Sequence, residues 1–238
     1  MDAISDITHC IFRVMGNGQG WDKPNGFHKR RKEDAKKYRH RHDVVVPDCV
    51  TWDADMGREV DKLFSKGVTH VHYVGHSHGF GRGFIAFEKA LRKRNKKELK
   101  QWKKVGHKNG MPRARQIIIV NAIGNDAVRY PKFLGLIPIP PSKATKFMLV
   151  RSLAPWSKIK LRAASACHVM GTRQDNRLPK GAPIFHGKQE IKVELHNTDE
   201  DGTKLVHHDA KPEENERDFD ESTVSRNQEL AVFKEYIG

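Results

Sequence analysis

The sequence feature that most constrains the fold is a strand pattern that leads directly into a glycine-flanked serine. Residues 68–74 are rich in valine and tyrosine, as expected of a buried strand. Residues 75–79 read Gly-His-Ser-His-Gly and fit the spacing G-x-S-x-G. Apolar residues then recur at helical spacing, at Phe80, Phe84, Phe87 and Leu91. We therefore predict a strand, a tight turn and a helix, with the Ser77 hydroxyl exposed. The glycines are required because a Cβ would strike the neighbouring strand or helix.

Strand and helix patterns alternate along the rest of the 238 residues. A helix with an apolar stripe is predicted between residues 56 and 64, capped by Asp53 or Asp55, and another over 224–237. Further buried strands are predicted over residues 9–15, 44–46, 116–123, 164–170 and 191–195. This alternation predicts an α/β fold with a mostly parallel central sheet, as one domain over residues 1–238.

Two segments interrupt the alternation. Residues 127–160 carry many apolar side chains without strand periodicity, and prolines break them. They are predicted to form either a cap that lines an acyl pocket or a helix packed on the sheet. Residues 197–221 are polar and acidic, and we expect a long surface loop there.

A glycine-rich segment, residues 16–20, follows the first predicted strand. A dinucleotide-binding loop G-x-G-x-x-G would need glycine at position 21, where the chain has Trp21. Two other interpretations stay open. The loop could point a backbone N–H, that of Asn17, at a developing negative charge, or it could be an ordinary glycine turn.

The charge of the chain is strongly positive, with a formal net charge of +15. Two basic runs, residues 28–42 and 89–108, contribute much of it. Such a charge favours nucleic acid or an anionic surface as a partner, although it could serve solubility alone. Few aromatic residues accompany residues 28–42, so binding of single-stranded nucleic acid has little support there.

Histidines gather around the predicted turn in two H-x-H pairs, His70 with His72 and His76 with His78. This spacing can bind zinc, which makes a metal-dependent hydrolase an alternative. The pattern H-x-H-x-D-H is broken, because Phe80 and Gly81 replace its aspartate and last histidine. We predict neither a metal nor another cofactor. His70 and His72 also indicate either a shallow strand or a polar site beneath the turn.

The order of these parts resembles the α/β-hydrolase superfamily, specifically its small lipase, esterase and cutinase-like members. The resemblance rests on the glycine loop at 16–20, the G-x-S-x-G turn at 75–79, and a late strand followed by Gly171, Asp175 and Pro179. A histidine near the last strand completes the order serine, aspartate, histidine. The resemblance implies a three-layer hydrolase fold. The early antiparallel strands of larger relatives have no counterpart in the few residues before the first strand.

The resemblance also implies the site. Ser77 would be the nucleophile, Asp175 the acid and His207 the base of a catalytic triad that cleaves a carboxylic ester. The backbone N–H groups of Asn17 and His78 would form the oxyanion hole. Asp126 is the alternative acid, and His196 and His208 are alternative bases.

The apolar runs and the predicted site indicate the compartment and the partners of the protein. No apolar run is long enough to cross a membrane and no signal peptide is evident, so we expect a cytoplasmic protein. The partner is an ester or acyl substrate. The alternative to an enzyme is a basic protein that has a hydrolase scaffold and binds nucleic acid or an anionic surface.

Overall fold

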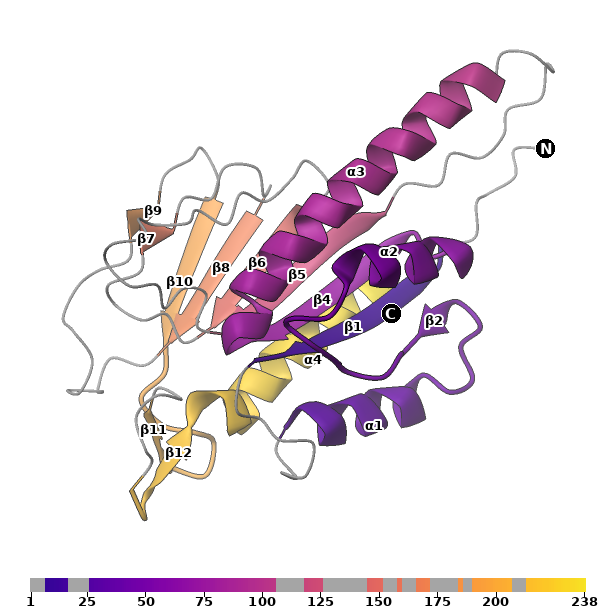
Figure 1. Ribbon diagram of the computed structural model, residues 1–238. Coiled ribbons are helices and arrows are strands. Elements are labelled where there is room, and N and C mark those ends of the chain that lie inside the picture. Colours follow the sequence, from indigo (N-terminus) through magenta and orange to yellow (C-terminus); the bar gives the residue numbers. More distant parts are fainter. Residues whose placement is uncertain are drawn as a thin grey trace.

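The computed structural model has a parallel eight-stranded sheet at its centre (Figure 1). The structure describes residues 7–16, 26–105, 118–125, 145–151, 158–159, 166–171, 184–185, 190–206 and 213–238. In spatial order the strands are β10 (Glu190–Leu195), β8 (Ala166–Gly171), β6 (Thr145–Arg151), β5 (Ile119–Asn125), β4 (His70–His76), β1 (His9–Met15) and β2 (Val44–Val45), with β3 (Val50–Thr51) also paired to β1. Every pair is parallel, so the carboxyl ends of all strands lie at one edge. The prediction of an α/β fold with a mostly parallel sheet is confirmed.

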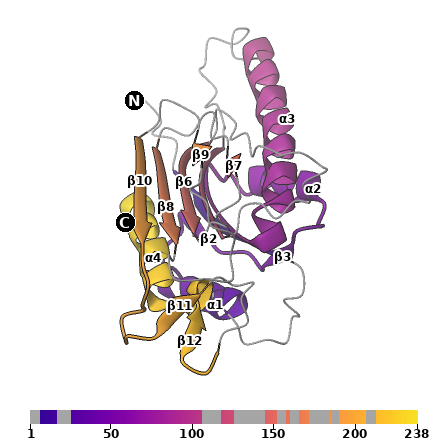
Figure 2. The ribbon, with the colours of Figure 1, turned by 90° about the vertical axis from the view of Figure 1, so that its left-hand side faces the viewer.

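Helices cover both faces of this sheet, which gives three layers (Figures 1 and 2). The helices α2 (Met56–Ser65) and α3 (Arg82–Val105) pack on one face. The helices α1 (Phe27–Lys37) and α4 (Thr223–Ile237) pack on the other. Two small parallel sheets complete the described elements: β7 (Lys158–Ile159) with β9 (Ile184–Phe185), and β11 (Lys204–Val206) with β12 (Glu216–Asp218).

The face under α2 and α3 is apolar. Asp55 caps α2 by accepting from the backbone N–H groups of Gly57 and Arg58, as predicted for one of the two aspartates. The predicted stripes of both helices are buried against the sheet. They comprise Met56, Val60, Leu63 and Phe64 of α2, and Phe84, Phe87 and Leu91 of α3 beside Phe80.

The face under α1 and α4 holds buried polar groups among its apolar ones. Side chains alternate along a strand, so His9, Ile11, Arg13 and Met15 of β1 share this face. Arg13 is fully buried, and its Nη2 lies 2.6 Å from Asp34 of α1 and also pairs with Glu229 of α4. The helices thus dock on this face through ion pairs as well as apolar contacts.

Arginines from three elements surround the two buried carboxylates. Arg226 of α4 pairs with both Asp34, at 2.8 Å, and Glu229, and Arg30 of α1 lies 3.6 Å from Glu229. We call Arg13, Arg30, Asp34, Arg226 and Glu229 the ion cluster. Its interactions raise the pKa of Arg13 against the opposing effect of burial, so Arg13 stays charged inside the fold.

Two predictions about the segments between elements are wrong. Residues 145–151, inside the expected cap or helix at 127–160, form β6, an inner strand between β5 and β8. Residues 147–150 are continuously apolar and show no alternation, which is typical of the inner strands of parallel sheets. Residues 127–144 and 152–157 lie outside the described residues, and the single domain over 1–238 stays a prediction.

The acidic stretch at 197–221 is not simply a surface loop. It contains β11 and β12, and Asp199 within it is buried. The Asp199 carboxylate accepts from the backbone N–H groups of Thr223 and Val224 at 3.0 and 3.1 Å and pairs with Arg217. An acidic residue here anchors the positive end of α4.

The order of the strands reverses next to β1. The chain goes from β1 to β2 and β3 on one side, and then to β4 on the other. At such a switch point the connections after neighbouring strands leave toward opposite faces and open a space between them. The segments that start at Gly16 and at Ser77 are those connections, so the switch point lies at the predicted turn.

Candidate functional site

The turn after β4 has the form that the sequence predicts. Residues Ser77–Gly79 make one short 3₁₀ turn between β4 and α3. A Cβ on Gly79 would lie 2.2 Å from the carbonyl oxygen of Val14 in β1, and one on Gly75 would lie 2.7 Å from the Cα of Phe80. Both contacts are with backbone, which cannot move aside. The predicted need for glycine on each side of Ser77 is confirmed, although the Ser77 side chain lies outside the described part of the structure.

Two buried rings hold this turn in place. The Tyr73 hydroxyl donates a hydrogen bond to the Gly79 carbonyl at 2.5 Å. Burial raises the pKa of Tyr73 well above its usual value, so the phenol keeps its proton and remains a donor. The Phe80 ring covers Gly124 on β5, where a Cβ would lie 2.0 Å from it. Sequence reasoning missed Gly124, whose only signal is a glycine near the end of a strand otherwise made of larger residues.

Trp52, His78 and Arg82 gather beside the turn. The rings of Trp52 and His78 lie 5.6 Å apart between centroids, and the Arg82 guanidinium carbon is 5.5 Å from the Trp52 centroid. The backbone N–H of Trp52 donates to the Met15 carbonyl at 3.0 Å, which fixes the tryptophan against the end of β1. The turn is thus bordered by an aromatic ring and a cation. Trp52 was not among the predicted site residues, although a tryptophan directly after a short strand is a visible signal.

Of the two expected oxyanion donors, one belongs to the described turn and the other does not. His78 directly follows Ser77 in the 3₁₀ turn, so its backbone N–H belongs to the turn itself. Asn17 lies outside the described residues. Its neighbour Gly16 is buried and directly follows β1, which is hydrogen-bonded to β4. The glycine loop therefore begins beside the turn.

The expected acids follow two different strands at the same edge of the sheet. Asp175 and Asp126 both lie outside the described residues. Gly171 ends β8, three strands from β4, or about 14 Å at the usual strand spacing. Asn125, which precedes Asp126, is paired with His76, which precedes Ser77. The chain thus brings the start of the Asp126 segment much nearer to the turn than that of Asp175.

The expected bases belong to two segments that lie against each other. His196 follows β10, the edge strand, four strands from β4. His207 and His208 lie outside the described residues, but Leu205 before them is fully buried in the cluster that contains Met15 and Phe27. The backbone N–H of Leu205 donates to the carbonyl of Asn197, the residue after His196, at 2.9 Å. The fold therefore does not choose between His196 and His207.

The paired histidines do not converge on a metal site. His70 and His72 lie toward the start of β4, where His72 is fully buried and its Nε2 is 3.2 Å from Nδ1 of His9. Burial lowers the pKa of His72 to about 3, and neighbouring His9 and His70 add to this, so the ring is neutral. Within the described ranges, no three His, Cys, Asp or Glu residues are arranged to hold a metal ion.

Of the two interpretations of His70 and His72, the shallow strand is wrong, because β4 lies inside the sheet with helices on both faces. The polar site exists, but it lies at the opposite end of β4 from the turn. His76 is the histidine beneath the turn. It is buried, with its ring 6.0 Å from that of Phe27.

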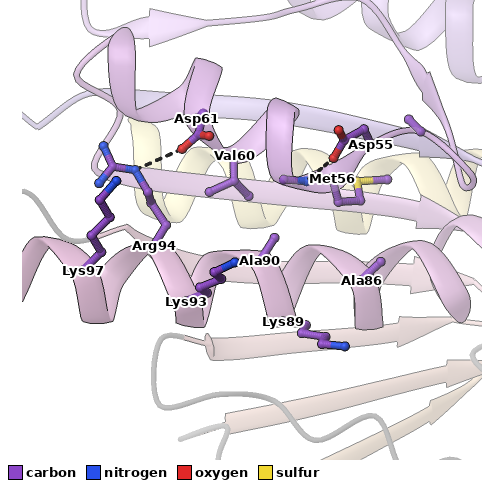
Figure 3. A pocket seen from close by; sticks show the side chains of 12 residues that line it. Asp55, Met56, Val60, Asp61, Ala86, Lys89, Ala90, Lys93, Arg94 and Lys97 are labelled. Atoms are coloured by element: carbon purple, nitrogen blue, oxygen red, sulfur yellow. Dashed lines mark hydrogen bonds and ion pairs between the residues drawn. The ribbon is translucent and has the colours of Figure 1, made fainter.

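A groove of about 600 Å³ lies on the outer surface between α2 and α3, away from the turn (Figure 3). Small residues, Gly57 of α2 and Ala86 and Ala90 of α3, leave it open, and lysines of α3 rim it. Its lining contains Ala54, Asp55, Met56, Gly57, Val60, Asp61, Ala86, Lys89, Ala90, Lys93, Arg94 and Lys97. None of the residues around the turn lines it, so this groove is separate from the candidate site.

The candidate site is therefore the turn at Ser77, bordered by His78, Trp52 and Arg82, at the switch point of a parallel sheet. Cys49, three residues before Trp52, is no rival nucleophile, because burial raises the pKa of its thiol to about 11. Over the described ranges, no helix is both long and apolar enough to cross a membrane. Comparisons with protein-family models, with curated proteins and with solved structures gave no match to this chain.

Proposed function

We propose that this chain is a serine hydrolase of the α/β-hydrolase type that cleaves a carboxylic ester. The observation that carries the proposal is the pair of glycine contacts around Ser77. Gly75 packs on the backbone of Phe80, just before the following helix, and Gly79 packs on β1, so the chain turns sharply with the serine at its tip. Such a turn between a parallel strand and a helix is the arrangement in which a serine nucleophile is exposed. Its position at the switch point, where α/β sheets bind ligands, adds support.

The reaction would proceed through an acyl-enzyme. The Ser77 Oγ attacks the ester carbonyl while His207 takes its proton, and Asp175 orients the imidazole and stabilises its charged form. The backbone N–H groups of His78 and Asn17 stabilise the oxyanion. His207 returns the proton to the leaving alcohol, and water then releases the acid. No cofactor takes part in this scheme, and the cytoplasm stays the predicted compartment.

The choice of acid rests on chain geometry. Asp175 lies four residues beyond Gly171, and four residues can span about 13 Å, close to the distance that three strand spacings put between β8 and β4. Asp126 needs no such excursion, because its segment starts beside the turn. Asp175 remains the proposed acid because the residues that follow its strand fit the α/β-hydrolase pattern. Asp126 is the alternative that the strand order favours.

The border of the turn bears on the substrate. Trp52 offers an aromatic surface next to the nucleophile, and Arg82 offers a positive charge over that surface. These groups suit an ester whose acyl or alcohol part is apolar with an anionic substituent. Substitution of Arg82 by Gln should therefore raise KM for a carboxylated ester more than for a neutral ester of the same length.

Labelling with a fluorophosphonate probe tests the nucleophile. Wild-type protein should become labelled, Ser77→Ala should not, and Ser65→Ala is the matched control because Ser65 is an exposed serine of α2. Chelator treatment should leave the labelling unchanged. A folded wild-type protein that takes no label would rule out the mechanism.

Kinetics of the remaining variants then identifies the triad. With a chromogenic ester, Asp175→Asn and Asp126→Asn should differ sharply, since loss of the acid costs on the order of 10⁴-fold in kcat while loss of a bystander costs little. His196→Gln, His207→Gln and His208→Gln separate the bases in the same way. We expect the large losses in Asp175→Asn and His207→Gln.

A further inference from the structure

The helix α3 carries an exposed row of positive charge that the ester hydrolase mechanism does not use. Between residues 89 and 105 the helix has one acidic residue, Glu98, which pairs with Arg94. We call the exposed cations of this segment the α3 stripe: Lys89, Arg92, Lys93, Lys96, Lys97, Lys100, Lys103 and Lys104.

The α3 stripe occupies one side of the helix. At 3.6 residues per turn its eight members fall within an arc of about 140°. The opposite side carries Phe84, Phe87 and Leu91, which are buried on the sheet, and Asn95, which hydrogen-bonds both backbone groups of Ile118. The stripe therefore faces away from the body of the protein. Arg94 lies on the flank of the helix and forms an ion pair with Asp61 of α2 at 3.0 Å.

The α3 stripe is long, straight and accessible. Ile118 directly precedes β5, so α3 passes the amino-terminal edge of the sheet near Asn95 and continues for about 15 Å to Val105. Both ribbon views show this projection (Figures 1 and 2). From Lys89 to Lys104 the stripe measures about 22 Å, or roughly one positive charge per 3 Å. A nucleic-acid duplex presents about one negative charge per 1.7 Å of its axis, which is a density of the same order.

We propose that the α3 stripe binds the phosphate backbone of double-stranded nucleic acid without sequence preference. Seven of its eight cations are lysines, which act on phosphates as point charges, whereas arginine would offer bidentate recognition of bases. The stripe begins at Lys89, seven residues after the start of α3, and runs away from the Ser77 turn. Binding there leaves the ester site open, and the proposal does not depend on the hydrolase mechanism.

The other anionic partners fit less well. A membrane-bound amphipathic helix inserts large apolar side chains, but among the described residues Ile7 is the only exposed large hydrophobic one. An acidic peptide seated in the α2–α3 groove would meet Asp55 and Asp61 on its α2 wall. Single strands bind through aromatic stacking, and Trp102, the one aromatic residue between residues 89 and 105, falls at a helical position opposite the stripe.

The second basic run supplies a control on the same molecule. Residues 28–42 lie with α1 on the opposite face of the sheet, so the two basic runs do not form one surface. Arg30 of that run is buried in the ion cluster. Lys29, Lys32 and Lys36 are exposed, like the members of the stripe, but belong to a shorter helix.

The experiment compares two triple variants that lose the same charge. Fluorescence anisotropy would follow binding of labelled DNA and RNA duplexes of mixed sequence across a range of salt concentrations. For Lys93→Gln, Lys97→Gln and Lys100→Gln combined, we expect at least a tenfold loss of affinity and a fall of about 3 in the slope of log K against log salt. For Lys29→Gln, Lys32→Gln and Lys36→Gln combined, we expect less than a threefold loss and an unchanged slope.

Three results would overturn the proposal: no salt-dependent duplex binding by the wild type, equal losses in the two triple variants, or tighter binding to polyglutamate or phosphatidylserine vesicles than to either duplex. Ser77→Ala should bind as the wild type does, so failure of the hydrolase mechanism would not affect this result. The six lysines replaced in the triple variants are exposed on helices, and circular dichroism would verify the folding of every variant before binding is compared.

Discussion

The two faces of the central sheet are built on different principles. Under α2 and α3 the contacts are apolar almost throughout, with Phe80, Phe84, Phe87 and Leu91 fully buried. Under α1 and α4, buried charges and histidines separate the apolar contacts. An apolar face tolerates changes that conserve volume, whereas a buried ion cluster depends on every partner being present. The two faces should therefore respond differently to the same substitutions.

The largest difference should come from placing the same side chain at a buried helix position on each face. Glu229→Met removes a carboxylate that pairs with three arginines, and it should cost about 3–5 kcal/mol in the free energy of unfolding. Leu91→Met conserves volume on the apolar face and should cost less than about 1.5 kcal/mol. Urea denaturation at neutral pH measures both.

A similar cost for the two substitutions would contradict the comparison, since it would mean that the ion cluster contributes no more than ordinary packing. Replacement of buried ion pairs by apolar groups can be neutral when all partners are replaced together. The single substitution avoids that case because Arg13, Arg30 and Arg226 keep their charges. Glu229→Gln, which retains a hydrogen-bond acceptor, should fall between the wild type and Glu229→Met.

The second difference is a dependence on pH confined to the polar face. His72 is buried against Phe233 and Tyr236 of α4, and its pKa is lowered from 6.5 to about 3. The unfolded chain takes up this proton near pH 6.5 and the folded chain does not. Stability is therefore complete above pH 6.5 and falls by about 1.4 kcal/mol for each pH unit below it, until the folded pKa is reached.

His72→Leu should remove this part of the acid sensitivity, and His40→Leu is the matched control at an exposed histidine. The measurement is the slope of unfolding free energy against pH between about 6 and 4. Some slope should remain, because burial also lowers the pKa values of His9 and His70, which face His72. Asp43 and Arg41 act on His9 in opposite directions. An unchanged slope in His72→Leu would show that the buried ring is protonated in the folded protein.

The difference between the faces also explains what the sequence could reveal. Apolar periodicity predicted α2, α3 and their buried residues, because on that face the side chains that recur at helical spacing are apolar and are buried on the sheet. Apolar periodicity gives no signal for α1, where Phe27, Arg30 and Asp34 form the buried stripe. In the sequence Arg30 and Asp34 look like solvated charges. Only their partners Arg13 and Glu229, distant along the chain, make their burial favourable.

The site was predictable to the extent that it is local. The turn could be identified because five consecutive residues encode it, and the glycines there meet specific backbone atoms. Trp52 escaped notice because its contacts with His78 and Arg82 depend on how β3 pairs with β1. Asp175 and His207 depend in the same way on connections between distant strands, and they stay predictions.

The third prediction concerns the turn, where the two faces meet at the end of β4. Gly79→Ala would force a Cβ against the β1 backbone and should cost about 1–3 kcal/mol or more, whatever the packing of either face. Gly57→Ala in α2 is the control, because its nearest neighbour would be the movable Asp55 carboxylate at 3.1 Å. Thermal unfolding measures both. Equal stability of the two variants would show that the turn is not held as tightly as its contacts indicate.

The smallest effect should come from an ion pair that lies outside both buried faces. Asp61 and Arg94 pair across the α2–α3 surface at 3.0 Å, with the Asp61 side chain 69% exposed. Water screens such a pair, and Arg94 keeps Glu98 and the Phe64 ring, 4.5 Å from its guanidinium carbon, as partners. Asp61→Asn should therefore cost less than about 1 kcal/mol, and added salt should make the loss smaller still. Because Glu229 has the same kind of partners and differs in being fully buried, a loss in Asp61→Asn as large as that in Glu229→Met would mean that burial is not what separates the two faces.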